Sequence, residues 1–206
     1  MIFDFSDKIN QHGLKIIFSN AEESNNLKKA IVSMSQTHST NIEVVKNKKL
    51  VYNNVDGIFA CNKNYALQVK TADCLPIFFI HKHNNIFGVI HAGWKGLKNG
   101  IISKSTNLLK SHINDLNEIT AFIGPSISQK NYEVKNEFID YFGNKFIDKV
   151  EDKFFCNLKG VASSQLQKIG VKNIIDCNQC TYENDNYHSY RRNKTSKRMT
   201  GLIYYE

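Results

Sequence analysis

The chain has 206 residues, of which 41% are hydrophobic and 22% are charged, a composition typical of a soluble globular protein with one sizeable core or two small ones. Its first residues include the acidic Asp4 and Asp7, and no apolar stretch follows them, which is unlike a secretory signal. The densest apolar run, Pro76–Ile80, is far shorter than the ~20 residues that a membrane-spanning helix needs. We therefore expect a cytoplasmic protein that does not interact with membranes.

The formal net charge of +8 raises the question of nucleic-acid binding. Lys and Asn are scattered along the whole chain, and the one dense basic cluster is RRNKTSKR, residues 191–198. This distribution favours a small anionic ligand over a nucleic acid. The five cysteines are an odd number in a chain without a signal, which favours reduced thiols over a disulfide framework.

The first part of the chain has the pattern of successive strands. Short segments rich in β-branched and aromatic residues alternate there with Asn, Gly, Lys and Asp, which favour turns. The predicted strands are Leu14–Phe18, Ala30–Met34, Ile42–Val45, Val55–Ala60, Tyr65–Val69, Pro76–Ile80 and Ile86–His91. Further strands are predicted later in the chain at Ile119–Ile123, Val171–Ile175 and Thr200–Tyr205.

Apolar residues at helical spacing begin after Gly96 and predict three helices. The first helix places on one face Leu97, Ile101, Ile102, Leu108 and Leu109. The second places on one face Val134, Phe138, Ile139, Phe142 and Phe146. The third ends at Gly170 and carries Val161, Ala162, Leu166 and Ile169. Because strands and helices do not alternate strictly, the pattern predicts an α+β or mixed α/β fold, with residues 1–206 as a single domain.

Three segments combine a metal-capable side chain with a predicted strand end. QTHST holds His38 before a strand, TADCLPIFF holds Cys74 ahead of a strand, and GVIHAGWKG ends an apolar strand at His91. Side chains at strand ends are held by the sheet and can converge on one cleft. Two imidazoles and a thiolate suit Zn²⁺ and leave a fourth position open for water or substrate. The spacing matches no zinc finger, and a cysteine ahead of an apolar strand is more often part of the core.

Eight segments carry a family resemblance, and they occur in the order QTHST, DGIFA, TADCLPIFF, VIHAGWKGLKNGI, FIGPSISQKNYEV, QLQKIGV, CTYE and YHSYRR. Together they closely resemble the laccase-domain, or YfiH-type, family, formerly described as polyphenol oxidases. The resemblance implies a four-layer α/β/β/α sandwich with mixed sheets. It also implies that His38, Cys74 and His91 bind Zn²⁺, with Cu²⁺ as the less favoured metal. The implied reactions are phosphorolysis of adenosine, inosine, guanosine or S-methyl-5′-thioadenosine and deamination of adenosine.

The chain departs from the family pattern at two places. The family usually has a Gly beside the Arg that follows SYRR, where this chain has Thr195-Ser196-Lys197-Arg198, so the role of Arg198 stays open. The region before Gln36 matches poorly, and no substrate contact is transferred there.

The chemistry of these reactions suggests roles for the residues around the predicted zinc site. Asp73, next to Cys74, is a candidate proton carrier for deamination, with a turn cap or a carboxylate that orients one of the histidines as alternatives. Arg191 and Arg192 offer planar guanidinium groups suited to phosphate, although a solvated basic surface has the same pattern. Trp94 is a candidate to stack on a purine ring, with packing beneath a helix as the alternative.

Two further motifs have weaker interpretations. Cys177-x-x-Cys180 is half of a zinc ribbon, and the chain has no second half. His81-Lys82-His83 is the only His-x-His pair, whereas a multicopper oxidase needs several such pairs.

Two other functions remain open alternatives. One is a metal-free hydrolase with Cys74 as nucleophile and His91 as base, acting in the editing of peptidoglycan precursors. The other is a non-enzymatic module that binds nucleic acid. The favoured reading has a purine nucleoside and phosphate as partners and a monomeric chain.

Overall fold

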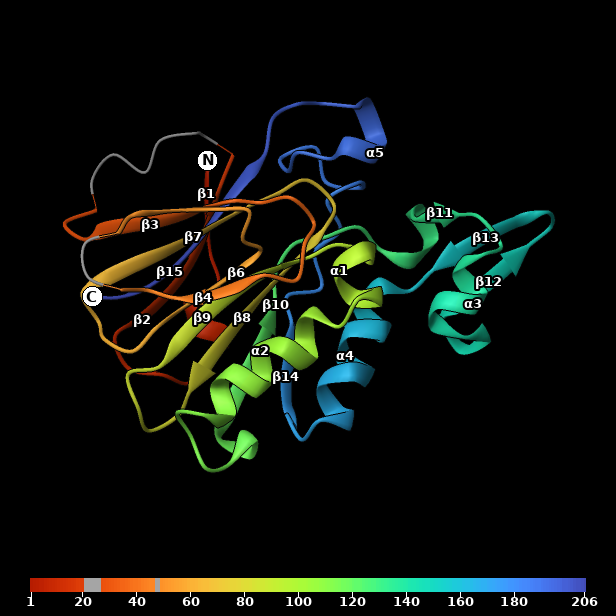
Figure 1. Ribbon diagram of the computed structural model, residues 1–206. Helices are drawn as coiled ribbons and strands as arrows, with labels where there is room; N and C mark the ends of the chain where they lie inside the picture. The colour runs from red at the N-terminus through yellow and green to blue at the C-terminus, as the bar shows by residue number, and fades with distance from the viewer. Residues whose placement is uncertain (21–26, 47–48) are drawn as a thin grey trace.

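The computed structural model describes residues 1–20, 27–46 and 49–206, and two six-stranded sheets packed face to face form its centre (Figure 1). The first sheet contains, in spatial order, β1 (Ile2–Asp4), β2 (Leu14–Ser19), β15 (Met199–Tyr205), β7 (Tyr65–Thr71), β3 (Ala30–Ser35) and β5 (Val51–Asn53). The second contains β14 (Asn173–Asp176), β10 (Ile119–Ile123), β8 (Leu75–His81), β9 (Phe87–Ala92), β6 (Gly57–Ala60) and β4 (Ile42–Val44). Both sheets are mixed. In the first, β7 is parallel to β3 and antiparallel to β15, and in the second, β10 is parallel to β14 and antiparallel to β8.

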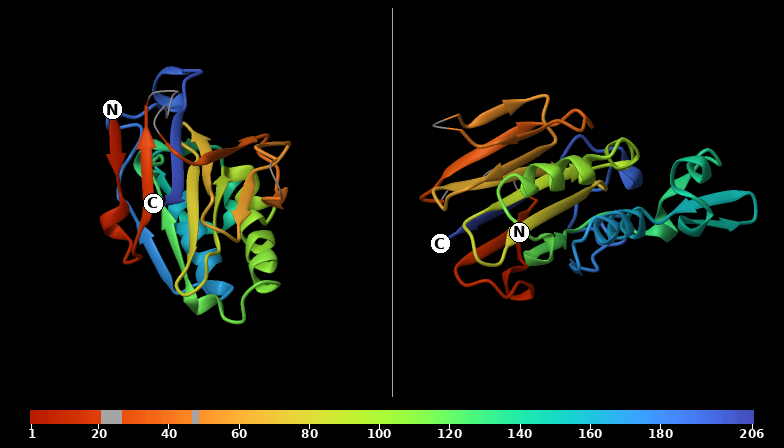
Figure 2. Two further views of the ribbon diagram at one scale, coloured as in Figure 1. Left: turned by 90° about the vertical axis from the view of Figure 1, so that its left-hand side faces the viewer. Right: turned by 60° about the horizontal axis from the view of Figure 1, so that its bottom comes forward.

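Helices cover the outer face of the second sheet, whereas no α-helix among the described residues covers the outer face of the first (Figure 2). The covering helices are α1 (Trp94–Lys98), α2 (Ile101–Lys110) and α4 (Leu158–Lys168). Their apolar side chains form one hydrophobic cluster with the facing side of the sheet, to which Ile77, Leu97 and Leu166 belong. The predicted mixed α/β class with mixed sheets is confirmed.

A small three-stranded sheet projects from one side of this body (Figure 1). It consists of β11 (Glu133–Val134), β13 (Lys153–Cys156) and β12 (Ile147–Val150), and α3 (Phe138–Phe142) lies beside it. A short helix, α5 (Tyr190–Asn193), lies in the connection from β14 to β15. Single 3₁₀ turns occupy Ser6–Lys8, Leu116–Glu118, Gln129–Asn131 and Asn144–Phe146. None of the helices that the structure describes has the length and apolar character needed to cross a membrane.

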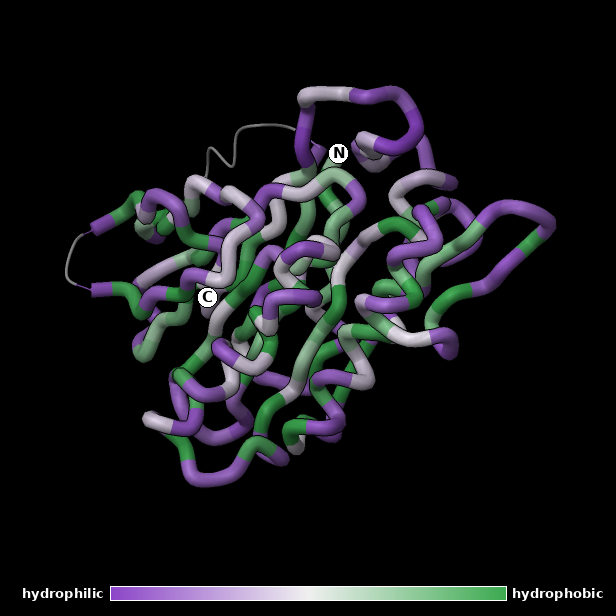
Figure 3. The backbone as a smooth tube through the Cα atoms, turned by 45° about the vertical axis from the view of Figure 1, so that its right-hand side comes forward, coloured by the Kyte–Doolittle hydropathy of each residue, from purple (hydrophilic) through white to green (hydrophobic). Residues whose placement is uncertain are grey.

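Strand β8 shows why the apolar run at its centre is continuous. Phe78 and Ile80 face the core between the two sheets, whereas Ile77 and Phe79 face the core beneath the helices. A strand that is buried on both faces has no polar alternation. The hydropathy colouring agrees, since the central strands are mainly hydrophobic and the segment that carries α5 is mainly hydrophilic (Figure 3).

All ten predicted strands are present, with ends that differ by at most two residues. The single helix predicted after Gly96 is instead two helices, because Gly100 has a left-handed φ of 83° and separates α1 from α2. The predicted helix through Val134 and Phe146 is wrong. Its apolar residues are distributed over β11, α3 and the turn that precedes β12, and α3 ends at Gly143, whose φ is 87°. The third helix is confirmed as α4.

Candidate metal centre

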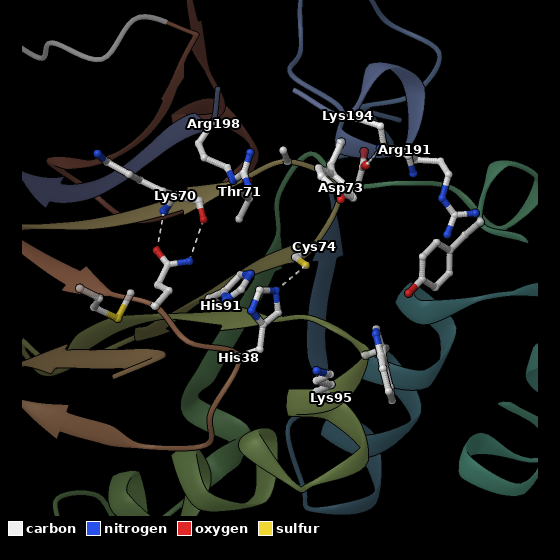
Figure 4. Close-up of a pocket in the computed structure, with 16 residues that line it drawn as sticks. His38, Lys70, Thr71, Asp73, Cys74, His91, Lys95, Arg191, Lys194 and Arg198 are labelled. Carbon is white, nitrogen blue, oxygen red and sulfur yellow. Dashed lines mark hydrogen bonds between the residues drawn. The ribbon is translucent and has the colours of Figure 1, made fainter. Parts of the chain in front are cut away.

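Three side chains from separate segments meet at one end of the paired sheets (Figure 4). His38 lies in the loop between β3 and β4, Cys74 directly precedes β8, and His91 lies within β9. Strands β8 and β9 are antiparallel neighbours in which Pro76 pairs with His91, and this register brings Cys74 close to the imidazole. The convergence that the strand-end positions predict is therefore present.

The distances between the three side chains suit a single metal ion. One potential ligand atom from each lies within 4.8 Å of the other two. Cys74 Sγ is 3.9 Å from His38 Nε2, and the centroids of the two imidazole rings are 4.7 Å apart. Tetrahedral Zn–S and Zn–N bonds of ~2.0–2.3 Å would hold such atoms roughly 3.3–3.7 Å apart. Small side-chain adjustments thus suffice for this His–Cys–His group to bind a metal.

A buried carboxylate orients His91. The Nδ1 atom of His91 is 2.8 Å from Asp56 Oδ1, and Asp56 is 0% exposed. Because Nδ1–H donates to this carboxylate, Nε2 is left as the acceptor atom of the ring. Histidines that bind metals in proteins are commonly fixed in this way by a carboxylate on their other nitrogen.

The same carboxylate also fixes the loop that carries His38. Asp56 accepts hydrogen bonds from the backbone amides of Thr37 and His38 at 3.1 Å each, and from the amide and hydroxyl of Ser39 at 2.7 Å each. These bonds hold His38 in a left-handed conformation with a φ of 59°. Burial alone would raise the pKa of Asp56, but the hydrogen bonds from His91 and Ser39 outweigh it and lower the pKa to about 2.

Asp56 lies within the DGIFA segment, which by itself predicts no role for this carboxylate. The available signal is its place directly before the apolar strand β6, where an ionised carboxylate requires several donors. Which donors surround it becomes visible only when the loop of His38 is folded over β6.

Burial and neighbouring charges shift the pKa of the Cys74 thiol in opposite directions, and they do the same for the His91 imidazole. Burial alone would raise the pKa of Cys74, but the His91 charge and the His38 hydrogen bond lower it to about 6. Burial alone would lower the pKa of His91, but the Cys74 thiolate and Asp56 raise it to about 9. In the metal-free protein at neutral pH, the pair is therefore a thiolate beside an imidazolium.

The His–Cys–His group opens onto a cavity of about 730 Å³. This volume lies within the ~300–1,000 Å³ typical of small-molecule sites. The residues that line it are strongly basic and include Lys70, Lys95, Arg191, Lys194 and Arg198. Its aromatic side chains come from Trp94, Tyr132 and Tyr190, and its one carboxylate belongs to Asp73.

Asp73 links the cavity wall to α5. Its carboxylate accepts a 2.7 Å hydrogen bond from Thr181 Oγ1 and a 2.6 Å bond from the backbone amide of Arg191. Asp73 therefore caps the first turn of α5. The carboxylate that orients His91 is Asp56, not Asp73.

The two predicted phosphate-binding arginines differ in their surroundings. Arg191 lines the cavity, and its Nη1 donates to the carbonyl of Glu133 at 2.7 Å. Its guanidinium lies over the ring of Tyr132, with 5.1 Å between Cζ and the ring centroid. Arg192 is not among the residues that line this cavity. Its Nη1 and Nη2 donate instead to the carbonyls of Thr181, Tyr182, Asn184 and Tyr187.

Trp94 lines the cavity and also packs against other aromatic side chains. It lines the cavity at the start of α1. Its ring also stacks on Tyr141, with 5.9 Å between centroids and an interplanar angle of 3°, and contacts Phe138. This packing holds the indole rigidly against the small-sheet side of the cavity.

The other metal-capable motifs have different local roles. Cys180 Sγ accepts hydrogen bonds from Ser128 N and Asn131 Nδ2, and Cys177 is buried. His81 Nδ1 accepts two backbone amides, and its Nε2 is 3.1 Å from Glu118. Within residues 1–20, 27–46 and 49–206, His38, Cys74 and His91 form the one group of three potential ligands.

Comparison with known proteins identifies the family of this fold and site. The family model described as multi-copper polyphenol oxidoreductase laccase matches residues 16–206, and the chain belongs to this family. The chain is 34% identical to a purine nucleoside phosphorylase from Campylobacter jejuni, over 84% of this chain and 76% of the relative. It is 38% identical to a purine nucleoside phosphorylase from Aquifex aeolicus, over 70% of this chain and 68% of the relative.

Solved structures show the same fold. A protein from Neisseria meningitidis superposes with a TM-score of 0.83 at 22% identity, covering 95% of both chains. The hypothetical protein YfiH from Bacillus licheniformis superposes with a TM-score of 0.80 at 25% identity, covering 87% of this chain and 76% of that one.

Proposed function

We propose that this protein is a zinc-dependent purine nucleoside phosphorylase that also deaminates adenosine. The observation that carries the proposal is the His–Cys–His group, oriented by Asp56, at the floor of a basic cavity. Two relatives in the same family are named purine nucleoside phosphorylases, which supports the substrate class. The proposed nucleosides are adenosine, inosine, guanosine and S-methyl-5′-thioadenosine.

The donor set fits Zn²⁺. A thiolate and two imidazoles are preferred zinc ligands, and His91 Nε2 is available because Asp56 occupies Nδ1. His38, Cys74 and His91 would hold the ion and leave a fourth position open toward the cavity. When bound, Zn²⁺ supplies Lewis-acid polarisation of a substrate atom.

The cavity wall supplies groups for the two substrates. The guanidinium of Arg191 is anchored at Nη1 and presents its other nitrogens to a phosphate. Trp94 is held against Tyr141 and offers an aromatic surface on which a purine can pack. A phosphate and a nucleoside bound in this way lie together in one cavity, which favours attack at the glycosidic carbon by proximity.

For deamination, we assign Asp73 as the proton carrier. It lies on the cavity wall and directly precedes Cys74 in the chain. Asp73→Asn is expected to lower adenosine deamination by about 100-fold, the size of a typical general acid–base contribution. Phosphorolysis of inosine, which has no amino group to remove, serves as the internal comparison. Equal losses of activity in both reactions would show that Asp73 only stabilises α5 and carries no proton.

The experiment that tests the proposal joins metal content to activity. The purified protein is expected to contain about one Zn²⁺ per chain, and adenosine with phosphate is expected to yield adenine and ribose 1-phosphate. Cys74→Ala is expected to lose both the metal and the activity. Cys61→Ala is the matched control, because Cys61 is exposed and does not line the cavity. Full activity in a metal-free Cys74→Ala protein would overturn the proposal.

A specific observation also favours a second candidate, a metal-free cysteine hydrolase. The lowered pKa of Cys74, the raised pKa of His91 and the carboxylate of Asp56 form a Cys–His–Asp series. Such an enzyme would be insensitive to chelators and would lose activity when Cys74 is alkylated. Its proposed substrate is a peptidoglycan precursor, and a strain that lacks the protein would accumulate serine in its peptidoglycan stems.

A further inference from the structure

Two arginines in the cavity wall are anchored at one end of the guanidinium only. The Nη1 atom of Arg198 donates to the carbonyls of Thr195 and Lys197 at 2.9 Å each, in the same way that Nη1 of Arg191 is tied to a backbone carbonyl. In the described part of the chain, the Nε and Nη2 atoms of both arginines make no hydrogen bond, and neither guanidinium group has a carboxylate partner. An anchored guanidinium with one unused edge is preorganised to bind a phosphate through two hydrogen bonds.

Arg192 shows how a purely structural arginine in this chain differs. Its Nη1 and Nη2 donate to four backbone carbonyls, and its Nε is 3.5 Å from Asp185. All of its guanidinium nitrogens therefore have partners within the protein. The unused edges of Arg191 and Arg198 are a property of the cavity and not of arginines in this region generally.

The charge of the cavity exceeds what one phosphate requires. Lys70, Lys95 and Lys194 also line it, and none of them has a carboxylate within 4.0 Å among the residues that the structure describes. The one carboxylate in the wall, Asp73, already accepts two hydrogen bonds. A phosphate group carries about −1.5 to −2 at pH 7, so a single phosphate leaves most of this positive charge without a partner.

We propose that the cavity binds purine nucleoside 5′-phosphates in preference to the uncharged nucleosides, an inference that rests on the proposed function for its purine specificity. Arg198 holds the 5′-phosphate, and Arg191 holds the separate phosphate that takes part in phosphorolysis. The two arginines come from different elements, since Arg198 directly precedes β15 whereas Arg191 belongs to α5.

The arrangement of the cavity agrees with two subsites. In Figure 4, Arg198 lies on the side of the cavity next to His91, and Arg191 lies on the opposite side beyond Cys74. A nucleotide whose glycosidic bond is near the metal centre can therefore extend its 5′-phosphate toward Arg198 without entering the Arg191 subsite.

The test compares three ligands on the zinc-loaded protein by isothermal titration calorimetry without added phosphate. Adenosine 5′-monophosphate is expected to bind at least about 10-fold more tightly than adenosine, as one charge-assisted bidentate contact implies. Adenosine 3′-monophosphate has the same charge and base, and it is expected to bind more weakly than the 5′-isomer. Equal affinities of the two isomers would mean that the basic wall attracts any anion, and this result would overturn the proposal.

A pair of variants locates the subsite. Arg198→Gln is expected to reduce the preference for the 5′-phosphate over adenosine to near unity, whereas Lys197→Gln keeps it. Lys197 is the matched control, because it is the neighbouring cation and its side chain does not line the cavity. If Arg198→Gln fails to fold, Arg198→Lys is the second variant and is expected to lower the preference partially, because a lysine keeps the charge and loses the bidentate geometry. An unchanged preference in a folded Arg198→Gln protein would overturn the assignment.

The outcomes separate this inference from the proposed function. Phosphorolysis of adenosine by a protein that does not prefer the 5′-phosphate would overturn the inference and leave the proposed function standing. Tight, Arg198-dependent binding of the 5′-phosphate by a protein that cleaves no nucleoside would support the inference and overturn the proposed function.

Discussion

The carboxylate of Asp56 connects two of the three potential metal ligands through hydrogen bonds. It accepts the Nδ1–H of His91 and also the backbone amide of His38, so both imidazoles depend on one buried group. The strand-end positions of the two histidines and of Cys74 made a shared site possible, and the family resemblance of their motifs was needed to predict it. Asp56 could not be assigned from the sequence, because its donors come from a loop whose path depends on the folded sheets.

Asp56→Asn is therefore expected to lower the zinc affinity by about 10–100-fold. The substitution replaces one carboxylate oxygen with an NH₂ group, which cannot accept hydrogen bonds from the surrounding donors, so the orientation of His91 is no longer fixed. The variant should also lose about 1–3 kcal/mol of unfolding free energy through an unpaired buried donor. Because the pKa of Asp56 is about 2 instead of its ordinary 3.8, its contribution is present above pH ~4 and is lost as the pH falls through 2. Chelator competition and thermal unfolding measure the two effects.

The control for this prediction is Asp115→Asn. Asp115 is exposed and bonds only within its own turn, through Asn117. Wild-type zinc affinity in Asp56→Asn would show that the carboxylate does not orient His91 toward a metal.

The reactivity of Cys74 provides a pH-dependent prediction. In the metal-free protein, its alkylation rate by iodoacetamide should be half-maximal near pH 6 instead of near the ordinary thiol value of 9, since the alkylating species is the thiolate. The rate should fall as the pH drops through 6 and the thiol is protonated. His91→Gln should move the midpoint upward, because the charge of His91 is the largest influence that lowers the pKa.

Mass spectrometry of the alkylated peptides separates Cys74 from the other cysteines. Cys61 provides the comparison, because burial raises its pKa and it lies away from the metal centre. A Cys74 midpoint as high as that of Cys61 would contradict the thiolate–imidazolium pair.

At the scale of elements, Gly93 shows how closely α1 approaches the metal centre. A Cβ atom at Gly93 would lie 3.0 Å from Cys74 Sγ and 3.1 Å from His38 Cδ2. The φ of Gly93 is −76°, so alanine is compatible with the backbone and the effect of a substitution is confined to this contact. The absence of a side chain at Gly93 thus preserves the space in which the two ligands meet.

Gly93→Ala is expected to fold normally and to lower the zinc affinity by roughly 10-fold or more, because a displacement of a few tenths of an ångström disturbs a metal site. Gly96→Ala is the matched control in the same helix, where the nearest side-chain atom to an added Cβ is 3.4 Å away. It should leave the zinc affinity unchanged and stabilise α1 by about 0.5–1 kcal/mol. Zinc titration and thermal unfolding of both variants check this, and equal affinities in the two proteins would contradict it.

A strand or helix could be predicted from the sequence where one apolar pattern corresponds to one regular segment. Strand β8 was predicted with both ends within one residue, and helix α4 was predicted from its apolar face, because each buries its apolar residues within one regular element. The segment from Val134 to Phe146 has helical spacing, yet its residues reach the helix-side core from β11, α3 and a 3₁₀ turn. Spacing alone cannot separate these cases, because several short elements can bury residues in the same order as one helix.

At the scale of the whole molecule, the metal centre joins segments from both sheets. His38 follows β3 of the first sheet, whereas Cys74 directly precedes β8 and His91 lies within β9 of the second. A bound ion would therefore link the two sheets at one end. The sequence motifs predicted which residues meet, but the basic wall around them depends on β7, α1 and α5 coming together, and no local pattern contains this information.

Metal binding should accordingly stabilise the whole fold. At a free zinc concentration of 100 times the dissociation constant, the gain is about 2.7 kcal/mol, or roughly 5–10 °C in Tm for a chain of this size. A chelator should remove this increment from the wild type and from Cys61→Ala, whereas Cys74→Ala should show no increment to remove. Differential scanning calorimetry measures the shift, and a Tm that is independent of zinc in the wild type would contradict a link between the sheets.

The most direct measurement is X-ray absorption at the zinc edge of the purified protein. The account predicts one sulfur neighbour at ~2.3 Å together with nitrogen or oxygen neighbours at ~2.0–2.1 Å, and loss of the sulfur neighbour in Cys74→Ser. Zinc without a sulfur neighbour, or a sulfur neighbour that persists in Cys74→Ser, would show that the metal is held elsewhere and that His38, Cys74 and His91 do not form its site.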